Sequence, residues 1–293
     1  MRISATCLNC LVQKELDKID RFTDEEQKAS YLKEVMRLLV SVPESVTAPE
    51  LVPPLTVLYR EYFGEPRDFT KIKKEYNALM LSVADAVREK IRTADDPLLC
   101  AINYACVGNY IDFGTVKNVN RDELIELLED AANLDLEKEA VAKLFADLAK
   151  AKTLVVLTDN CGEIVMDKLL IEQIKASFPQ LSITAIVRGI PVINDATMED
   201  AKEVGLDEIV PVIGNGSGCA GTALNEIADE AMEKLKTADV ILSKGQGNFE
   251  TLYGCGMNIH YLFLCKCIWF TKRFHMQPKT PVLVNEMDVK VYC

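Results

Sequence analysis

Residues 153–170 read "TLVVLTDNCGEIVMDKLL" and decide the fold class. The apolar, β-branched start is typical of a buried strand, and the apolar spacing after Gly162 predicts a helix. A strand that leads into a helix often carries a glycine-rich phosphate loop at the junction. Here an acid and an amide, Asp159 and Asn160, stand at that position. The stretch therefore predicts one unit of an α/β sheet with a polar strand end.

Similar units repeat toward the C-terminus. Strands are predicted at residues 153–158, 182–189, 208–213, 239–245, 260–267 and 281–286. The helices predicted after the first four strands span residues 161–178, 197–205, 224–238 and 249–254. Short apolar strands separated by helices are typical of a mainly parallel sheet with helices on both faces. Because ligands of such sheets bind at the carboxyl ends of the strands, those ends are the candidate site.

The part of the chain before this sheet is predicted to be helical. Its apolar residues recur at helical spacing, and one helix is predicted to begin at a capping box formed by Thr23 and Glu26. We predict a helical N-terminal domain over residues 1–148 and an α/β domain, which carries the site, over residues 149–293.

Composition narrows the classes of function. The chain has 293 residues and a net charge of −12, which argues against nucleic acid and anionic membranes as partners. No apolar run approaches a membrane span, and the N-terminus is too acidic for a signal peptide, so we expect a cytoplasmic protein. Ten cysteines are too dilute for a disulfide scaffold, and most are expected to be reduced.

Two strand ends combine an acid with an amide. Asp159 and Asn160 follow the first strand, and Asn194 and Asp195 follow the second. Helix capping is the simpler interpretation, since Asn160 with Glu163 forms a capping box and either Asn194 or Asp195 could serve as a cap. However, a cap needs only one side chain. Two such ends together indicate an all-oxygen cluster that suits Mg²⁺ or Mn²⁺.

Two further strand ends are rich in glycine. Gly216-x-Gly218-x-x-Gly221 matches the dinucleotide fingerprint, but that fingerprint needs an acid at the end of the next strand. Lys244 stands there instead, so an NAD site is disfavoured. Lys244 in "SKGQGN" suits phosphoryl oxygens, unless it is a lysine that reaches the surface. Lys266 interrupts another apolar strand and also needs an anionic partner.

Cysteine and histidine motifs are sparse. Cys7-x-x-Cys10 has zinc or redox spacing, but the chain has no second such pair and only two histidines. A metal site, a disulfide, or a helix that packs its thiols near the site all stay open for this pair.

At these residues the chain resembles the metal-dependent damage-control phosphatases, a former family of unknown function, some of whose eukaryotic members are also described as protein-glutamate methyltransferase-like. The motifs "TDNCGE", "VRGIPVINDAT", "ADVILSKGQGNFETL" and "LCKC" occur in the order of that family. "CLNCLVQ" and "VGNYIDFG" resemble its stand-alone, mostly prokaryotic branch. The resemblance runs almost end to end and implies a Rossmann-like domain joined to a helical N-terminal portion.

The resemblance also implies roles for individual residues. By motif position the metal ligands would be Asp159, Asn160 and Asp195, and the catalytic residues Asp159 and Lys244. Asn109 and Asp112 would face the same cleft, with capping as their alternative role. The full set of expected substrate contacts is Asn109, Asp112, Glu163, Arg188, Asn194, Lys244, Gly245, Gln246, Asn248 and Lys266.

The expected activity is hydrolysis of small phosphate monoesters, either sugar phosphates or damaged phosphometabolites, with Mn²⁺, Co²⁺, Ni²⁺ or Mg²⁺ as cofactor. The alternatives are an S-adenosylmethionine-dependent carboxyl methyltransferase and a non-enzymatic protein that binds phosphometabolites. The methyltransferase needs an acid for the ribose, where this sequence has lysine. The expected partner is a small phosphorylated metabolite, and nothing in the sequence indicates an oligomeric state.

Overall fold

A six-stranded sheet forms the centre of the computed structural model, which describes residues 2–114 and 119–289. The strands are β1 (Thr153–Leu157), β2 (Ser182–Val187), β3 (Val212–Gly214), β4 (Val240–Lys244), β5 (Ile259–Leu264) and β6 (Pro281–Asn285). They lie in the order β3-β2-β1-β4-β5-β6, and only the β5–β6 pair is antiparallel. The predicted mainly parallel sheet is confirmed.

Helices cover both faces of the sheet because each strand is apolar on both sides. Along β1, Leu154 and Val156 belong to one hydrophobic core, whereas Val155 and Leu157 belong to another. The first core is shared with α4 (Thr70–Thr93), α5 (Pro97–Gly108), α6 (Arg121–Asp130), η2 (Ala131–Asn133), α7 (Lys138–Lys150), α8 (Glu163–Ser177) and α9 (Met198–Glu203). The second core is shared with α10 (Asp229–Thr237), α11 (Gln246–Leu252) and α12 (Ile268–Arg273), and η3 (Glu286–Asp288) follows β6.

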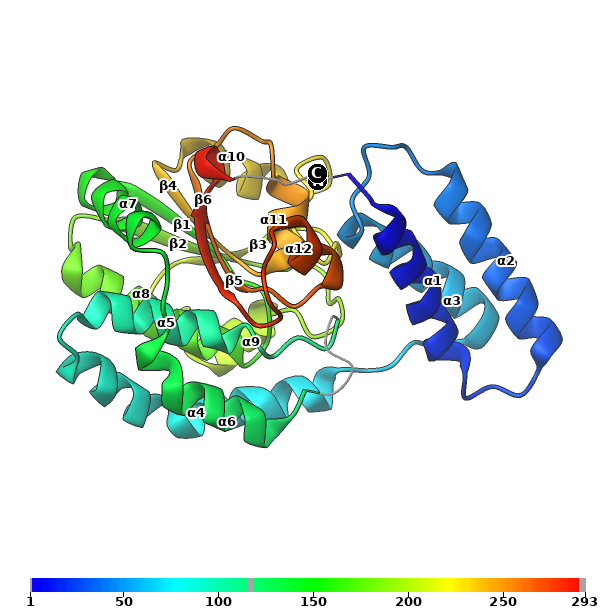
Figure 1. Ribbon diagram of the computed structural model, residues 1–293, viewed down its shortest axis with the longest axis horizontal. Coiled ribbons are helices and arrows are strands. Elements are labelled where there is room, and N and C mark those ends of the chain that lie inside the picture. Colours follow the sequence, from blue (N-terminus) through cyan, green and yellow to red (C-terminus); the bar gives the residue numbers. More distant parts are fainter. Residues whose placement is uncertain (1, 115–118, 290–293) are drawn as a thin grey trace.

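The remaining helices form a separate unit with its own core. They are α1 (Ala5–Ile19), α2 (Glu25–Ser41), η1 (Pro49–Leu51) and α3 (Val52–Phe63). Buried residues such as Ile19, Tyr31 and Leu55 pack with one another and not with the two cores at the sheet. Figure 1 shows this α1–α3 unit beside the α/β part, joined to α4 through residues 64–69. The chain thus leaves the α1–α3 core and enters the cores at the sheet near residue 64. The domain boundary at 148/149 stays a prediction.

Some element boundaries differ from those predicted. The capping box of Thr23 and Glu26 is wrong, because Asp24 is the N-cap of α2 and accepts a hydrogen bond from the Gln27 N–H at 2.9 Å. The helix predicted from residue 224 begins only at Asp229, since Ala228 donates its N–H to the carbonyl of Asn215. Among the residues described, no helix is both long and apolar enough to cross a membrane.

Candidate active site

The polar strand ends meet where the strand order reverses. β1 and β4 are neighbours in the sheet, and the chain turns to opposite sides from them, so a crevice opens beyond their carboxyl ends. Asp159 follows β1 by two residues, and Lys244 is the last residue of β4. An isolated bridge between Asn160 and Asp195 joins the ends of β1 and β2. The fold therefore brings the predicted strand ends together.

A cleft of about 2250 Å³ lies over the carboxyl ends of the strands, between the sheet and the α1–α3 unit. Its walls come from α1, α3, the connector before α4 and the loops that follow β1, β2, β4 and β5. Six of the thirteen predicted site residues line it: Asp112, Asp159, Asn160, Asp195, Gln246 and Lys266.

The other seven predicted residues form a buried layer beneath the cleft wall. They are Asn109, Glu163, Arg188, Asn194, Lys244, Gly245 and Asn248. The structure thus divides one predicted set into residues that a ligand can reach and residues that hold those in place.

Arg188 contacts both acids that were predicted to bind a metal, Asp159 and Asp195. Its Nε donates to Asp195 Oδ2 at 2.6 Å, and its Nη2 lies 3.3 Å from Asp159 Oδ1. Its Nη1 donates to Asn248 Oδ1 at 3.0 Å. Although burial acts to lower it, the attraction of Asp195 and Asp159 raises the pKa of Arg188. The guanidinium stays charged and orients the two carboxylates.

Glu163 organises the two amides of the site. Its carboxylate accepts hydrogen bonds from Asn109 Nδ2 at 3.0 and 3.1 Å and from Asn160 Nδ2 at 2.9 Å. Both amides also donate to Asp159 Oδ2, at 3.1 Å from Asn109 and 2.7 Å from Asn160. These contacts use the amide nitrogen of Asn160. Its oxygen accepts from Asn194 Nδ2 at 3.0 Å on the side of β2.

Neither pair of strand-end residues caps the helix that follows it. Gly162, with a φ of +69°, is the N-cap residue of α8, so the predicted cap role of Asn160 is wrong; only the bond from the Asn160 N–H to Glu163 forms. Thr197 and Asp200 form the capping box of α9, so Asn194 and Asp195 are not caps either. Helix capping therefore does not account for Asn160, Asn194 or Asp195.

Lys244 is fully buried and does not reach the cleft. Its ammonium donates to Glu163 and Asp167, each at 2.6 Å, and to the Ala105 carbonyl at 2.9 Å. These acceptors use all three of its N–H bonds. Although burial acts against the charge, the two carboxylates raise the pKa of Lys244. The predicted contact with a substrate phosphate would require the ammonium to leave all three partners.

Lys266 is the lysine that lines the cleft. Its ammonium lies 2.7 Å from Asp112 Oδ2 and donates to the Asn109 carbonyl at 2.6 Å. Among the residues that the structure describes, these two acceptors account for two of the three N–H bonds of the ammonium. Asn109 thus connects Lys266 to the Asp159 cluster, because its side chain binds Asp159 and its carbonyl binds Lys266.

Gly245 allows the turn after β4 to touch Asp159. Its φ is +81°, and a Cβ built there would lie 2.0 Å from Asp159 Oδ2. The fingerprint glycine Gly221 also serves backbone packing, since a Cβ there would lie 2.6 Å from the Gly247 carbonyl oxygen. That loop does not lead directly into a helix, because α10 begins at Asp229. The geometry gives the dinucleotide interpretation no support.

Acids outnumber bases in the buried cluster. Asp159, Glu163, Asp167 and Asp195 face Arg188 and Lys244, so four carboxyl groups oppose two cations, a formal excess of two negative charges when all six groups are ionised. Burial, followed by repulsion from Glu163 and Asp195, raises the pKa of Asp159 well above its ordinary value. Burial also raises the pKa of Asp195 to about 6, against the opposing effect of Arg188. A cation bound at the cleft wall would relieve this excess.

The donor set suits a hard cation. Asp159, Asn160 and Asp195 line one wall and offer carboxylate and amide oxygens, which Mg²⁺ and Mn²⁺ prefer. Within residues 2–114 and 119–289, no group of three or more His, Cys, Asp or Glu is placed to hold a metal. A metal here would therefore depend on the amide oxygen of Asn160 beside the two acids.

Several supporting residues were missed from the sequence. Asp167 pairs with Lys244, and burial raises its pKa to about 7. It lies four residues after Glu163 on α8, and this i, i+4 spacing could have indicated it. Thr222 donates to Asn248 Oδ1 at 2.7 Å, and Asn77 accepts the Gly162 N–H at 2.6 Å. These last two come from distant segments and carry no local signal.

Cys7 and Cys10 lie on α1 and line the same cleft. Both are free thiols. Cys7 accepts a hydrogen bond from the Ser4 hydroxyl at 3.1 Å. Their role stays a prediction.

The fold and the site together define a Rossmann-like α/β protein with a charged cluster and a ligand cleft at its topological switch point. Residues 3–279 match the damage-control phosphatase ARMT1-like domain, and the chain belongs to this family. The predicted resemblance is thereby confirmed, whereas the assignment to the stand-alone branch stays a prediction. Membership in the family supports a phosphatase role.

Similar proteins cover nearly the whole chain. An uncharacterized protein from Methanocaldococcus jannaschii is 32% identical over 278 residues, covering 91% of this chain and 90% of that protein. A damage-control phosphatase from Pyrococcus horikoshii is 31% identical over 274 residues, covering 91% and 92% of the two chains. One from Archaeoglobus fulgidus is also 31% identical, covering 91% and 93%.

The fold also matches a solved structure. The crystal structure of a DUF89 family protein from P. horikoshii superimposes with a TM-score of 0.81 at 26% identity. It covers 98% of this chain and 99% of its own. The likeness therefore includes the α1–α3 unit as well as the sheet.

Proposed function

We propose that this protein is a metal-dependent phosphatase that hydrolyses small phosphate monoesters, such as sugar phosphates or damaged phosphometabolites. One observation carries the proposal. The cleft wall combines two buried carboxyl groups and an amide, which belong to a cluster where acids outnumber cations, with the ammonium of Lys266. Phosphoryl transfer needs both halves of this set, oxygen ligands for a cation and a positive group for the phosphate.

The cation proposed is Mn²⁺, Co²⁺, Ni²⁺ or Mg²⁺, and Asp159, Asn160 and Asp195 would hold it. The oxygen-only donor set and the excess charge beneath it support this assignment. Polarisation of a phosphoryl oxygen is the chemistry that such a cation supplies when bound.

The residues of the chain itself have separate tasks in this proposal. Arg188 fixes the orientation of Asp159 and Asp195 through two charge-assisted hydrogen bonds. Lys266, whose ammonium has two acceptors within residues 2–114 and 119–289, neutralises charge on the phosphate oxygens. Lys244 acts as a positioning residue, because it holds Glu163, which in turn holds Asn109 and Asn160.

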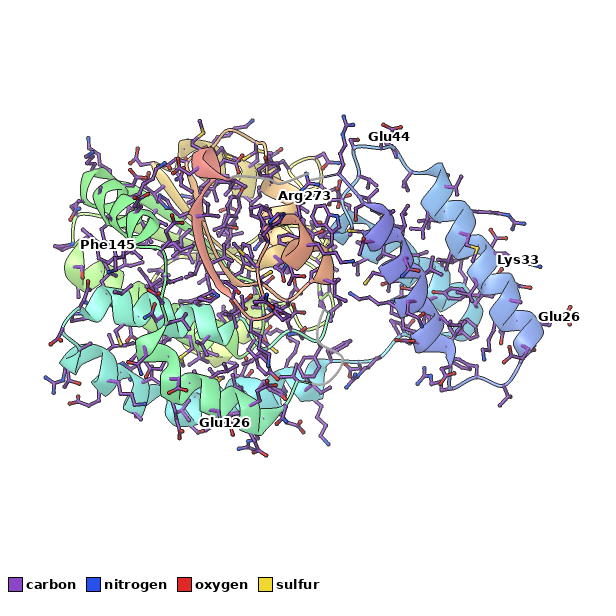
Figure 2. All side chains as sticks on the ribbon, in the orientation of Figure 1. Glu26, Lys33, Glu44, Glu126, Phe145 and Arg273 are labelled. Carbon is purple, nitrogen blue, oxygen red and sulfur yellow. The ribbon has the colours of Figure 1, made fainter. Side chains whose placement is uncertain are left out.

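Hydrolysis of an aryl phosphate in the presence of each of the four metals tests the proposal. We expect metal-dependent turnover that a chelator abolishes and the Asp159→Ala variant loses. Glu126→Gln is the control, because Glu126 lies on the outer surface of α6, away from the cleft (Figure 2). Thermal unfolding of each variant checks that it is folded.

Two results would contradict the proposal. Near-wild-type turnover by a folded Asp159→Ala variant would remove Asp159 from the site. No turnover by the wild type with any of the four metals, together with tight binding of phosphate, would instead indicate a binding protein without enzymatic activity.

A further inference from the structure

Ile193 adopts a backbone conformation that β-branched residues avoid. Its φ is +46°, and it is one of three non-glycine residues with a positive φ among those that the structure describes. The Asp195 N–H donates to the Val192 carbonyl at 3.0 Å, which closes a turn with Ile193 at its first central position. A positive φ at that position is typical of type I′ and II′ turns, where glycine is favoured. Isoleucine is therefore strained there.

The two residues that follow explain why the chain turns at this point. The Asn194 side chain is buried, where its Oδ1 accepts from the Phe113 N–H at 3.0 Å and its Nδ2 donates to Asn160 Oδ1 at 3.0 Å. Asp195 accepts a hydrogen bond from Arg188. A glycine before these two residues would allow the same turn without strain. The strain therefore retains the isoleucine side chain itself, and strain of this kind concentrates at functional sites.

The side chain of Ile193 lies beside the phosphate end of the cleft. Ile193 lines the cleft, and its Cδ1 lies 3.3 Å from the position that a Cβ on Gly114 would take. The same position is 3.1 Å from Oδ1 of Asp112, whose Oδ2 lies 2.7 Å from the Lys266 ammonium. Ile193 is thus close to the acid–lysine pair to which the proposed function assigns the phosphate.

Two aromatic rings border the same part of the cleft. Phe69, in the connector before α4, and Phe113, after α5, both line the cleft, and their ring centroids are 6.3 Å apart. The Phe113 N–H donates to Asn194, the residue after Ile193. We call Phe69, Phe113 and Ile193 the apolar subsite. It takes its residues from three segments far apart in the sequence, and none of its side chains can form a hydrogen bond with a ligand.

We infer that the apolar subsite binds the leaving group of the substrate, with Ile193 as a specificity-determining residue. The inference rests on the proposed phosphatase function and adds a substrate class to it, namely phosphate monoesters whose leaving group has an apolar alkyl or aryl portion. Such a portion gains free energy when it leaves water for an apolar wall. A polyol in the same place would bury hydroxyl groups against side chains that cannot pair with them.

Two substitutions and one control test the role of Ile193. Ile193→Gly removes the side chain, and Ile193→Asn replaces it with a polar one. Both new residues tolerate a positive φ, so neither adds strain. His275→Gly is the control, because His275 has a φ of +53°, is exposed and does not line the cleft. It relieves the same kind of backbone strain outside the ligand site. Urea unfolding checks that each variant is folded.

Phenylphosphonate and methylphosphonate are the probes, because they differ only in the apolar group and lack the ester bond that a phosphatase hydrolyses. Calorimetry with Mn²⁺ present measures the affinity for each. We expect the wild type to bind phenylphosphonate more tightly than methylphosphonate, and Ile193→Gly and Ile193→Asn each to lower this preference about 10-fold. His275→Gly should keep the preference of the wild type.

Three results would overturn the inference. The wild type could show no preference for phenylphosphonate, or the preference could survive in either folded variant of Ile193. An equal loss of preference in His275→Gly would also overturn it, because relief of backbone strain alone would then account for the effect. Failure of the proposed function is distinguishable, since it is seen as absence of metal-dependent hydrolysis of a phosphate ester by the wild type, whereas phosphonate binding is measured without turnover.

Discussion

Two lysines near the ends of neighbouring strands are both buried and paired with acids, but only Lys266 lines the cleft. The Lys244 ammonium is buried between Glu163 and Asp167, whereas the Lys266 ammonium lies at the cleft wall beside Asp112. A buried ion pair that loses one partner leaves uncompensated charge, which destabilises the protein strongly. A lysine at a cleft wall contributes mainly to ligand affinity. Substitution of Lys244 should therefore mainly lower stability, whereas substitution of Lys266 should mainly weaken ligand binding.

Substitution of each lysine by methionine tests this difference. We expect Lys244→Met to lower the free energy of unfolding by about 3–5 kcal/mol, because Glu163 and Asp167 stay buried without their cation. Lys266→Met should lose less stability and raise the KM for an aryl phosphate. Urea unfolding and steady-state kinetics give the two quantities. If Lys244→Met keeps its stability and raises KM instead, the predicted phosphate contact of Lys244 is supported.

Gly245 offers a second test at the scale of one residue. Gly245→Ala strains a backbone with φ of +81° and drives a methyl group into the carboxylate of Asp159. We expect the strain to lower the free energy of unfolding by about 1–3 kcal/mol. The displaced carboxylate should lower activity about 100-fold. Gly254→Ala is the control, because its φ is +90° and a Cβ there meets nothing within 4 Å. Equal activity of the two variants would contradict a role for the Gly245–Asp159 contact.

The sequence predicted which residues gather at the site better than it predicted which of them a ligand can reach. Asp159, Asn194 and Lys244 all follow or end strands, and parallel strands bring such ends together. However, Lys244 and Lys266 have the same local pattern of a cation in an apolar run. Only their tertiary partners, Asp167 and Asp112, separate them. The i, i+4 spacing of Glu163 and Asp167 could indicate an acidic pair, but not which lysine the pair faces.

At the scale of elements, the strands were the most predictable part. Each of the six predicted strands overlaps an observed one, and the parallel strands β1 and β4 were continuous apolar runs. The third strand was predicted over residues 208–213 but spans only Val212–Gly214. Boundaries were less predictable where loop contacts decide them. The start of α11 at Gln246, three residues earlier than predicted, depends on the turn at Gly245. Helix capping also depended on neighbours, since Asn77 on α4 satisfies the N–H of Gly162 before α8.

Asp239 joins β4 to β1 at the amino ends of these parallel strands, opposite the carboxyl ends that carry the site. Its Oδ2 accepts from the backbone N–H groups of Lys152 at 2.8 Å and Thr153 at 3.0 Å, and from the Thr153 hydroxyl at 3.1 Å. These hydrogen bonds lower the pKa of Asp239 in the folded state. A lowered folded pKa means that the stabilisation is present above the unfolded pKa, about 3.9, and is lost as pH falls through the folded value.

We therefore expect Asp239→Asn to be less stable than the wild type at pH 7, with a difference that shrinks below about pH 4. The urea midpoints of both proteins across this pH range give the measurement. Activity at pH 7 should be unchanged, because the site lies at the opposite, carboxyl ends of the strands. Glu126→Gln is the control for removal of a surface carboxylate elsewhere in the molecule. A gap between Asp239→Asn and wild type that is constant or grows in acid would disprove the account.

At the scale of the whole molecule, the cleft lies between parts that have separate cores. The α1–α3 unit packs around residues such as Ile19 and Val35, whereas α4–α9 pack on the sheet (Figure 1). The cleft wall takes residues from both parts, including Lys14 of α1, which donates to the Gly114 carbonyl at 2.5 Å. Binding should therefore depend on the α1–α3 unit even though the charged cluster belongs to the sheet.

Hydrogen exchange can test whether the two parts open separately. Ile19 is fully buried in the α1–α3 core and does not line the cleft, and Leu144 is its fully buried counterpart on α7. Ile19→Ala should lower the free energy of unfolding by about 2–5 kcal/mol, because it creates a cavity. If the cores are independent, faster amide exchange is confined to residues 5–63, while β1, β2 and β4 keep their protection. Leu144→Ala should show the reverse, with faster exchange in α7 and the sheet and unchanged exchange in α2. Equal acceleration in both parts by either variant would mean that the chain opens as one cooperative unit, and the α1–α3 unit would then be a fixed wall of the cleft.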